Sequence, residues 1–188
     1  MVGQIESLSA KSDGNEELFA LGGPQLENSA IEAGPIPTGQ STIISGGSLP
    51  CDWVIFSVGP KYDKRYLSAS DQALFSAYKS ALTLAASKNV KRLVLNCIYL
   101  RNKKYPRFEA AHVALRTVRK FLEHPSGVGN CFEKVMFCVS SQEDFEIYLT
   151  LMTAYFPRNA VELSNQFNLL PKRDELGDIW GQVIQILF

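Results

Sequence analysis

The sequence is poor in the residues that build metal centres and disulfide frameworks. Its 188 residues include four cysteines and two histidines. No two cysteines have Cys-x-x-Cys spacing, and neither histidine has a neighbouring set of ligands. We therefore expect no metal, no cofactor, and free thiols in a reducing compartment. Cys97 and Cys138 lie inside apolar runs, which predicts that both point into a core.

The chain also lacks a net charge and a long apolar run. Its 19 Lys and Arg balance 19 Asp and Glu, so no overall field favours nucleic acid or an anionic membrane. No apolar run reaches the roughly 18–20 residues that span a bilayer, and the start of the chain lacks the layout of a secretion signal. We expect a soluble cytoplasmic protein, with a nuclear location as the alternative. Any anion-binding surface must then be local, because the chain as a whole carries no net charge.

What the sequence does contain is a hydrophobic fraction of 46%, enough for one domain with a core, and a series of strand patterns. Apolar runs rich in β-branched residues predict four strands, within residues 40–45, 53–58, 92–98 and 135–139. The second and third runs are continuously apolar, which is typical of strands buried on both faces of an α/β sheet.

Helix patterns occupy the segments between and around these strands. Two short helices are predicted before the first strand, ended by Gly22-Gly23-Pro24 and by Gly34-Pro35. Apolar residues at three- and four-residue steps predict longer helices at 71–87 with Ser70 as N-cap, at 107–123 with Arg116, Arg119 and Lys120 on the outer face, and at 142–155. Strands alternating with such helices predict a three-layer α/β/α sandwich with a largely parallel or mixed sheet.

Several blocks of the sequence resemble the macro-domain (Appr-1-p processing) family. PTGQSTIISGGSLPCDWVIFSVGP, at 37–60, is similar to the family's Pro-Thr-Gly-Glu-Ala stretch, Gly turn and following strand. Tyr105-Pro106 with the pattern at 109–123 is similar to the helix after the family's second ligand loop. YFPRN, at 155–159, resembles the subgroup of the ganglioside-induced differentiation-associated protein of the second type, which joins a macro domain to a Sec14-type lipid-binding module.

The resemblance begins at about residue 16 and implies a macro-domain-like sandwich lacking the family's first strand-helix-strand portion. The resemblance implies that two ligand-binding residues of the family are then missing as well: the Asp that binds adenine and the Asn that binds the distal ribose. We expect a macro domain at 1–159 and a C-terminal tail at 160–188, or the start of a linker to an absent Sec14-type module. The apolar run 180–188 fits a truncated product or a docked strand. The lost second strand lies inside the family's sheet, so we expect a marginally stable chain in which the N-terminal segment or 180–188 fills its place.

Both phosphate-binding loops of the family are rewritten in this sequence. Asp13-Gly14-Asn15-Glu16 stands at the glycine loop, and Gly22-Gly23 matches a helix end instead. The second loop is replaced by Tyr99, Leu100, Arg101, Asn102, Lys103, Lys104 and Tyr105. Side chains with Cβ atoms hinder the close approach of backbone amides to a pyrophosphate. Three cationic heads and two tyrosine faces nevertheless predict an anion contact at 99–105, with a solvated surface loop as the alternative.

These departures predict a degenerate, non-catalytic macro domain. It would act as a binding module for a nucleotide or RNA-type anion, such as an ADP-ribose-like nucleotide or poly(A), or for a protein partner. The alternative is ADP-ribose binding or ADP-ribosyl (ADP-ribose-1''-phosphate) hydrolase activity through a residual pocket. We expect no catalytic residues, because the sequence identifies no orienting partner for Ser140-Ser141 or His112. The oligomeric state stays open.

Overall fold

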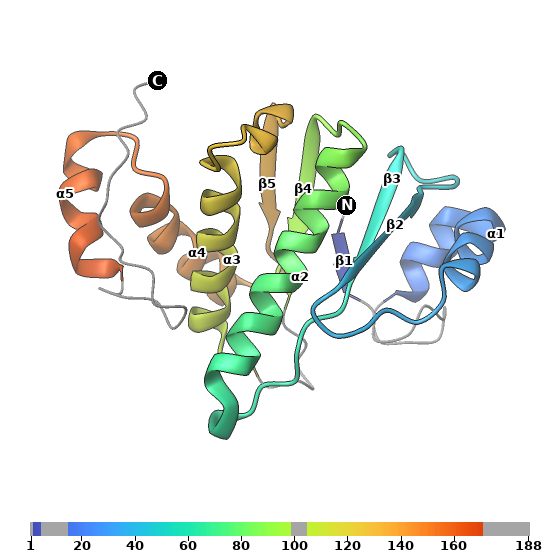
Figure 1. Cartoon of the computed structure of the whole chain (residues 1–188), viewed down its shortest axis with the longest axis horizontal. Coiled ribbons are helices and arrows are strands. Elements are labelled where there is room, and N and C mark those ends of the chain that lie inside the picture. The colour runs from blue at the N-terminus through green and yellow to red at the C-terminus, as the bar shows by residue number, and fades with distance from the viewer. Residues whose placement is uncertain (1, 5–14, 99–104, 171–188) are drawn as a thin grey trace.

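A computed structural model describes residues 2–4, 15–98 and 105–170, which form a mixed β-sheet flanked by helices (Figure 1). The five strands are β1 (Val2–Gln4), β2 (Ser41–Ser45), β3 (Trp53–Ser57), β4 (Arg92–Asn96) and β5 (Lys134–Cys138). Their order across the sheet is β2-β3-β1-β4-β5, with β2 antiparallel to β3 and the other pairs parallel. The predicted α/β sandwich with a mixed sheet is confirmed.

Seven helical segments connect or follow the strands in the described part of the chain. They are α1 (Glu16–Ala33), η1 (Lys64–Tyr66), α2 (Leu67–Ser87), α3 (Arg107–Leu122), η3 (Val128–Cys131), α4 (Gln142–Tyr155) and α5 (Ala160–Leu169). Figure 1 shows α2 and α3 side by side over β4 and β5, with α1 beyond β2 and β3 at the opposite edge from α4 and α5. None of the helices in the described residues combines the length and apolar character needed to cross a bilayer.

Strand β3 carries core residues on both faces, as its continuous apolar run predicts. Ile55 packs into the core beneath α2 and α3, together with Leu93 and Leu95 of β4. Val54 and Phe56 point to the other face, where they meet apolar residues of α1: Phe19, Leu26 and Ala30. Because side chains alternate along a strand, α1 and α2 cover opposite faces of this half of the sheet.

The N-terminal segment supplies the central strand. Val2 of β1 pairs in register with Ile55 of β3 and with Leu95 of β4, both in parallel orientation. Of the two segments expected to fill the interior of the sheet, the structure thus places the N-terminal one there. Strand β1 has only three residues, whereas β3 and β4 have five each.

The glycines at 22 and 23 have a structural role, as predicted. Gly23 adopts φ 71°, which breaks α1 into two helical parts before Pro24. The carbonyl of Gly22 accepts a hydrogen bond from the Ser48 amide at 3.0 Å, which ties the bend to the β2–β3 turn. A Cβ atom at Gly22 would lie 2.3 Å from Leu26 Cδ2, so the bend also depends on close packing.

Four local expectations differ from the structure. Helix α2 begins at Leu67 because η1 runs directly into it, so Ser70 lies buried inside the helix and is not its N-cap. Arg116 is 6% exposed because α3 is packed between α2 and α4 and has little outer face.

Cys97 is half-buried as expected, but Cys138 is exposed at the end of β5. Helix α5 occupies 160–169, where the sequence pattern predicted no regular structure, and packs on α4.

Candidate functional site

The parallel strands β1, β3, β4 and β5 all end at the same edge of the sheet. In open α/β sheets, ligands bind in the crevice outside the carboxyl ends of the strands. The four connections that follow these ends are residues 5–15, 58–63, 97–106 and 139–141. This carboxyl edge is therefore the candidate site, and the predicted binding segment 99–105 belongs to one of its connections.

Of the seven residues predicted to bind a ligand, Tyr99, Leu100, Arg101, Asn102, Lys103 and Lys104 lie outside the described residues. Tyr105 is described, and its side chain is only 4% exposed. Its ring packs against Tyr62 with centroids 4.9 Å apart, and its hydroxyl donates a hydrogen bond to Asp71 of α2. Tyr105 thus fixes the end of the loop and offers little face for stacking.

The start of the same loop is fixed by Tyr78 of α2. The Ile98 amide donates a hydrogen bond to the Tyr78 hydroxyl at 2.8 Å, and that hydroxyl donates to the Asn96 carbonyl at 3.2 Å. Tyr78 is 1% exposed, so this bridge lies in the core. Helix α2 therefore holds both ends of the 99–104 loop, through Tyr78 at one end and Asp71 at the other.

An ionic network joins the start of α3 to the start of α4. Arg107 Nη1 donates to Ser141 Oγ and to Asp144 Oδ2, both at 2.9 Å. The Ser141 hydroxyl donates to the same carboxylate oxygen and accepts from the Asp144 amide, which caps α4. Arg107 Nε also lies 3.3 Å from the exposed Glu143. The network locks the connection after β5 against the helix that follows the 99–104 loop.

Burial shifts the pKa values of three groups, His112, Cys97 and Tyr148, toward their neutral forms. Burial, together with the positive charge of Arg116, lowers the pKa of His112 to about 4. His112 Nδ1 lies 2.8 Å from the Tyr155 hydroxyl, so the ring is also held in place. Burial raises the pKa of the Cys97 thiol to about 11 and that of Tyr148 well above 10.0. At pH 7 the His112 ring is therefore uncharged, and the Cys97 thiol and the Tyr148 hydroxyl keep their protons.

The start of α1, where the sequence resemblance places a glycine loop, is described from Asn15 onward. Asn15 is buried, and its carbonyl accepts a hydrogen bond from the Phe19 amide at 3.0 Å. Glu16 and Glu17 occupy the first turn and are exposed. Two carboxylates offset the positive end of the helix dipole, so the described part of this helix start disfavours a phosphate.

The residues that shape this edge were not among those predicted from the sequence. Tyr78 and Asp71 looked like ordinary helix positions, and Arg107 like a surface residue. One local signal was present for Ser141. Ser141-x-x-Asp144 before an apolar helix is a capping pattern. Nothing local reveals that the capping carboxylate also binds Arg107, which is 37 positions away.

Known proteins are similar to this chain both in sequence and in fold. Residues 6–114 match the Macro domain family. The Dictyostelium discoideum protein GDAP2 homolog is 36% identical over 170 residues, which cover 90% of this chain and 29% of that protein. Ganglioside-induced differentiation-associated protein 2 of Homo sapiens is 35% identical over 179 residues, 95% of this chain and 35% of that protein. The chain therefore spans about a third of the length of the curated relatives it matches.

Solved structures agree with the sequence matches. The crystal structure of the GDAP2 macro domain superimposes with a TM-score of 0.77 at 36% identity, covering 84% of this chain and 77% of that one. A mutant of the Oceanobacillus iheyensis macrodomain with ADPR gives a TM-score of 0.66 at 26% identity, covering 79% and 82%. Both the family and the resemblance to the GDAP2 subgroup are confirmed. The chain belongs to the macro domain family.

Proposed function

We propose that this macro domain is a non-catalytic binding module for an ADP-ribose-like nucleotide or an RNA-type anion. The observation that carries the proposal is the fixing of both ends of the 99–104 loop at the carboxyl edge of the sheet. Tyr78 holds the start of the loop and Tyr105, through Asp71, holds its end. In the sequence, Arg101, Lys103 and Lys104 fall between these two fixed ends, which lie at the edge where α/β sheets bind ligands.

Three cationic residues within the sequence 101–104 are well suited to phosphate. The whole chain has a net charge of +0, so the attraction for an anion arises locally from these three side chains. Because Ile98 and Tyr105 are already held in place, less conformational entropy is lost when a ligand binds between them. The related Oceanobacillus iheyensis macrodomain has been solved with ADPR, which supports the same chemical class of ligand here.

The described residues at this edge favour binding over catalysis. A general base must have a pKa near the working pH and must be able to reach the reacting water. The Asp144 carboxylate is 1% exposed and is bound by Arg107 and Ser141. His112 is bound to Tyr155 and stays neutral. The Ser141 hydroxyl donates to a carboxylate and not to a histidine, so it lacks the partner that activates a serine nucleophile.

Calorimetry with matched charge variants tests the proposal. The loop variant is the triple change Arg101→Ala, Lys103→Ala and Lys104→Ala. The control variant is Lys88→Ala, Lys91→Ala and Arg92→Ala, which removes the same charge at the amino end of β4. We expect saturable binding of ADP-ribose or poly(A) by the parent and the control, and at least a 10-fold weaker affinity for the loop variant. Equal weakening in both variants would contradict a localised site.

Salt and product assays separate the remaining functions. Affinity for poly(A) that falls steeply between 50 and 200 mM salt, by roughly an order of magnitude for each pair of phosphate contacts, indicates binding through phosphates. Release of ADP-ribose from an ADP-ribosylated protein, or of phosphate from ADP-ribose-1''-phosphate, would favour the hydrolase alternative. If neither ADP-ribose nor poly(A) gives a heat of binding, the remaining proposed function is the binding of a protein partner.

A further inference from the structure

An aromatic contact joins two connections at the carboxyl edge of the sheet. Tyr62, in the connection after β3, packs on Tyr105, with the two ring centroids 4.9 Å apart. Tyr105 belongs to a buried cluster between α2 and α3, and Tyr62 packs against that cluster. The connection 58–63 and the short helix η1 that follows it therefore lie directly beside the end of the predicted binding segment.

This neighbouring connection is itself basic. Residues 61–66 contain three cations and one carboxylate: Lys61, Lys64, Arg65 and Asp63. All three cationic residues are exposed. In the sequence, Lys104 is the residue directly before Tyr105. Two basic segments that are distant in the sequence thus each have one end at the contact between Tyr62 and Tyr105.

The carboxylate of this connection is already paired. Arg65 donates from Nε to Asp63 Oδ1 at 3.1 Å and from Nη2 to Asp63 Oδ2 at 2.7 Å. The Arg65 amide donates to the same side chain at 2.9 Å, which fixes the start of η1. These bonds from Arg65 lower the pKa of Asp63, so the carboxylate stays charged at neutral pH and balances the charge of Arg65.

Lys61 and Lys64 are left as the uncompensated charges of this connection. Within the part of the chain that the structure describes, neither ammonium group forms a hydrogen bond or an ion pair. Arg107, at the start of α3, differs in this respect, because its guanidinium is held by Glu143 and Asp144. Two exposed lysines without bound carboxylates raise the local concentration of anions at this edge, although the whole chain has no net charge.

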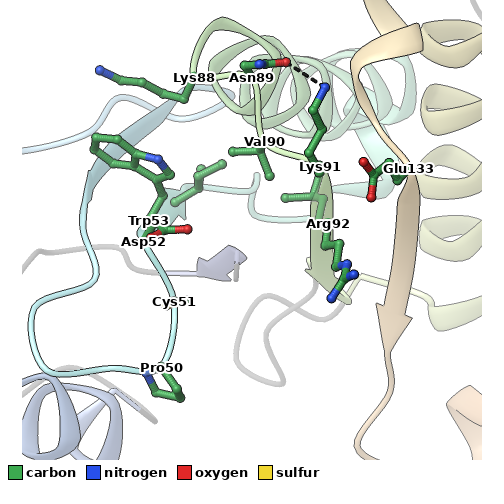
Figure 2. A pocket seen from close by; sticks show the side chains of 12 residues that line it. Pro50, Cys51, Asp52, Trp53, Lys88, Asn89, Val90, Lys91, Arg92 and Glu133 are labelled. Carbon is green, nitrogen blue, oxygen red and sulfur yellow. Dashed lines mark hydrogen bonds between the residues drawn. The ribbon is translucent and has the colours of Figure 1, made fainter.

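The cations at the opposite end of the sheet are placed differently (Figure 2). A cleft of about 610 Å³ lies there between the turns into β3 and β4, and charges of both signs line it: Lys88, Lys91, Arg92, Asp52 and Glu133. The Lys88 ammonium lies 4.8 Å from the centroid of the Trp53 ring, and Lys91 Nζ bonds to the Asn89 side chain. These two lysines already contact groups of the protein, so they provide a matched control for the pair at the carboxyl edge.

We propose that Lys61 and Lys64 extend the carboxyl-edge site into a track for the phosphates of a single-stranded RNA. The inference rests on the proposed anion-binding role of 99–104 and names the class of its ligand. An ADP-ribose-like nucleotide carries a single pyrophosphate, whereas an RNA strand carries a phosphate at every nucleotide and can contact both basic segments at once. Contacts to phosphates carry no sequence information, so we expect little preference among RNA sequences.

Titration with ligands of two lengths tests the track. Lys61→Gln with Lys64→Gln removes two charges from exposed positions. Calorimetry compares ADP-ribose with an oligoadenylate of about ten nucleotides. We expect the variant to bind ADP-ribose within about twofold of the parent and the oligoadenylate roughly 5-fold or more weakly. The slope of log affinity against log salt should become shallower by about 1.4, because each phosphate contact on a single strand contributes about 0.7.

Two further variants control for the charge and for its position. Lys88→Gln with Lys91→Gln removes the same charge at the amino end and is expected to leave both affinities unchanged. Lys61→Arg with Lys64→Arg keeps the charge and is expected to retain oligoadenylate binding. Urea denaturation checks that every variant is folded. An equal loss in the amino-end variant, or a loss that the arginine variant shares, would overturn the track.

A gain of affinity gives a test that damage to the fold cannot imitate. Asp63→Asn removes the carboxylate that Arg65 holds, and so adds one available cation beside Lys64. We expect oligoadenylate to bind about 2-fold or more tightly, with a salt dependence that is steeper by about 0.7. Unchanged or weaker binding by a folded Asp63→Asn chain would count against a phosphate track at η1.

The triple loop variant separates a failure of the track from a failure of the proposed function. If Arg101→Ala, Lys103→Ala and Lys104→Ala together weaken oligoadenylate binding and the change at Lys61 and Lys64 does not, the track is overturned and the loop site stands. An equal loss of ADP-ribose and oligoadenylate affinity at Lys61 and Lys64 also overturns it, because these lysines would then belong to a mononucleotide site. If the parent binds neither ligand, both proposals fail together.

Discussion

At the carboxyl end of the sheet, buried hydrogen bonds tie the connections to the helices, whereas at the amino end β3 and β4 are separated by an open cleft. The tied end contains Tyr78, Asp71 and the network of Arg107 with Asp144. The open end contains the cleft between the turns into β3 and β4, with the exposed Lys88 and Lys91 beside it. The candidate ligand edge is therefore supported by hydrogen bonds between distant segments, whereas the amino end is partly open. The variants below test that contrast, from the largest expected effect to the smallest.

The ionic network at the tied end is expected to give the largest effect. Asp144→Ala removes the carboxylate that binds Arg107 and Ser141, and leaves the guanidinium without its buried partner. We expect a loss of about 2–4 kcal/mol in the free energy of unfolding, measured by urea denaturation. Asp63→Ala breaks the exposed pair with Arg65 and is expected to change stability too little to measure. Similar small effects from both variants would mean that the network does not hold this end together.

The Tyr78 hydroxyl is expected to matter less, because it forms neutral hydrogen bonds. Tyr78→Phe leaves the Ile98 amide and the Asn96 carbonyl without their bridge, at a cost of about 1–3 kcal/mol. The same change should weaken nucleotide binding by freeing the start of the 99–104 loop. Urea denaturation and calorimetry measure the two effects. Tyr66→Phe is the matched control, because Tyr66 is 64% exposed. If the Tyr78→Phe protein is less stable but binds nucleotide as tightly as the parent, the Tyr78 hydrogen bonds have no role in ligand binding.

The lowered pKa of His112 predicts how the stability of the chain changes in acid. Its pKa is lowered to about 4 in the folded chain, below the value near 6.5 of the unfolded chain. The unfolded chain therefore takes up a proton first, so this contribution to stability is complete above pH 6.5 and is lost as the pH falls toward 4. We expect a loss of about 1 kcal/mol across this range, reduced by partial exposure of the ring. His112→Gln should flatten this part of the stability–pH curve. An identical curve for both proteins would contradict the lowered pKa.

The rim of the cleft at the amino end, where Lys88 lies over Trp53, is expected to give the smallest effect. Lys88→Ala removes the ammonium 4.8 Å from the Trp53 ring, at a cost of about 0.5–1 kcal/mol or less at this exposed site. Trp53 emission should change, and Lys88→Arg should retain most of the parent spectrum. Trp180→Phe in every sample isolates the Trp53 signal. A loss as large as that of Asp144→Ala would mean that the amino end is as firmly closed as the carboxyl end.

Regular elements were predictable wherever the pattern is local and long. The apolar stripe of α2, the continuous run of β3 and the glycine break in α1 were all predicted from sequence and are present in the structure. Helix α5 was not predicted, because its apolar pattern is weak and polar residues interrupt it. Its capping signal was available: the Asn159 side chain accepts from the Glu162 amide, and Glu162 accepts from the Arg158 amide.

The candidate site was predictable only as a segment of sequence. Glycine-free, basic residues at 99–104 could be recognised without coordinates, and their ligand role stays a prediction. The supports of that segment could not be found in this way, because they join residues 20, 34 and 37 positions apart. Tyr105 shows the difference: its position in the loop suggested an exposed face, and packing against Tyr62 buried it.

Composition and periodicity were enough to predict an α/β chain and the positions of its long helices, and the resemblance of several blocks was enough to predict the family. These properties depend on neighbours within a few residues, so they can be read along the chain. The place of Val2–Gln4 between β3 and β4, the cleft between the turns into β3 and β4, and the fixing of Ile98 and Tyr105 by α2 depended on folding. Each results from contacts between segments distant in sequence, whose register and burial exist only once the sheet has formed.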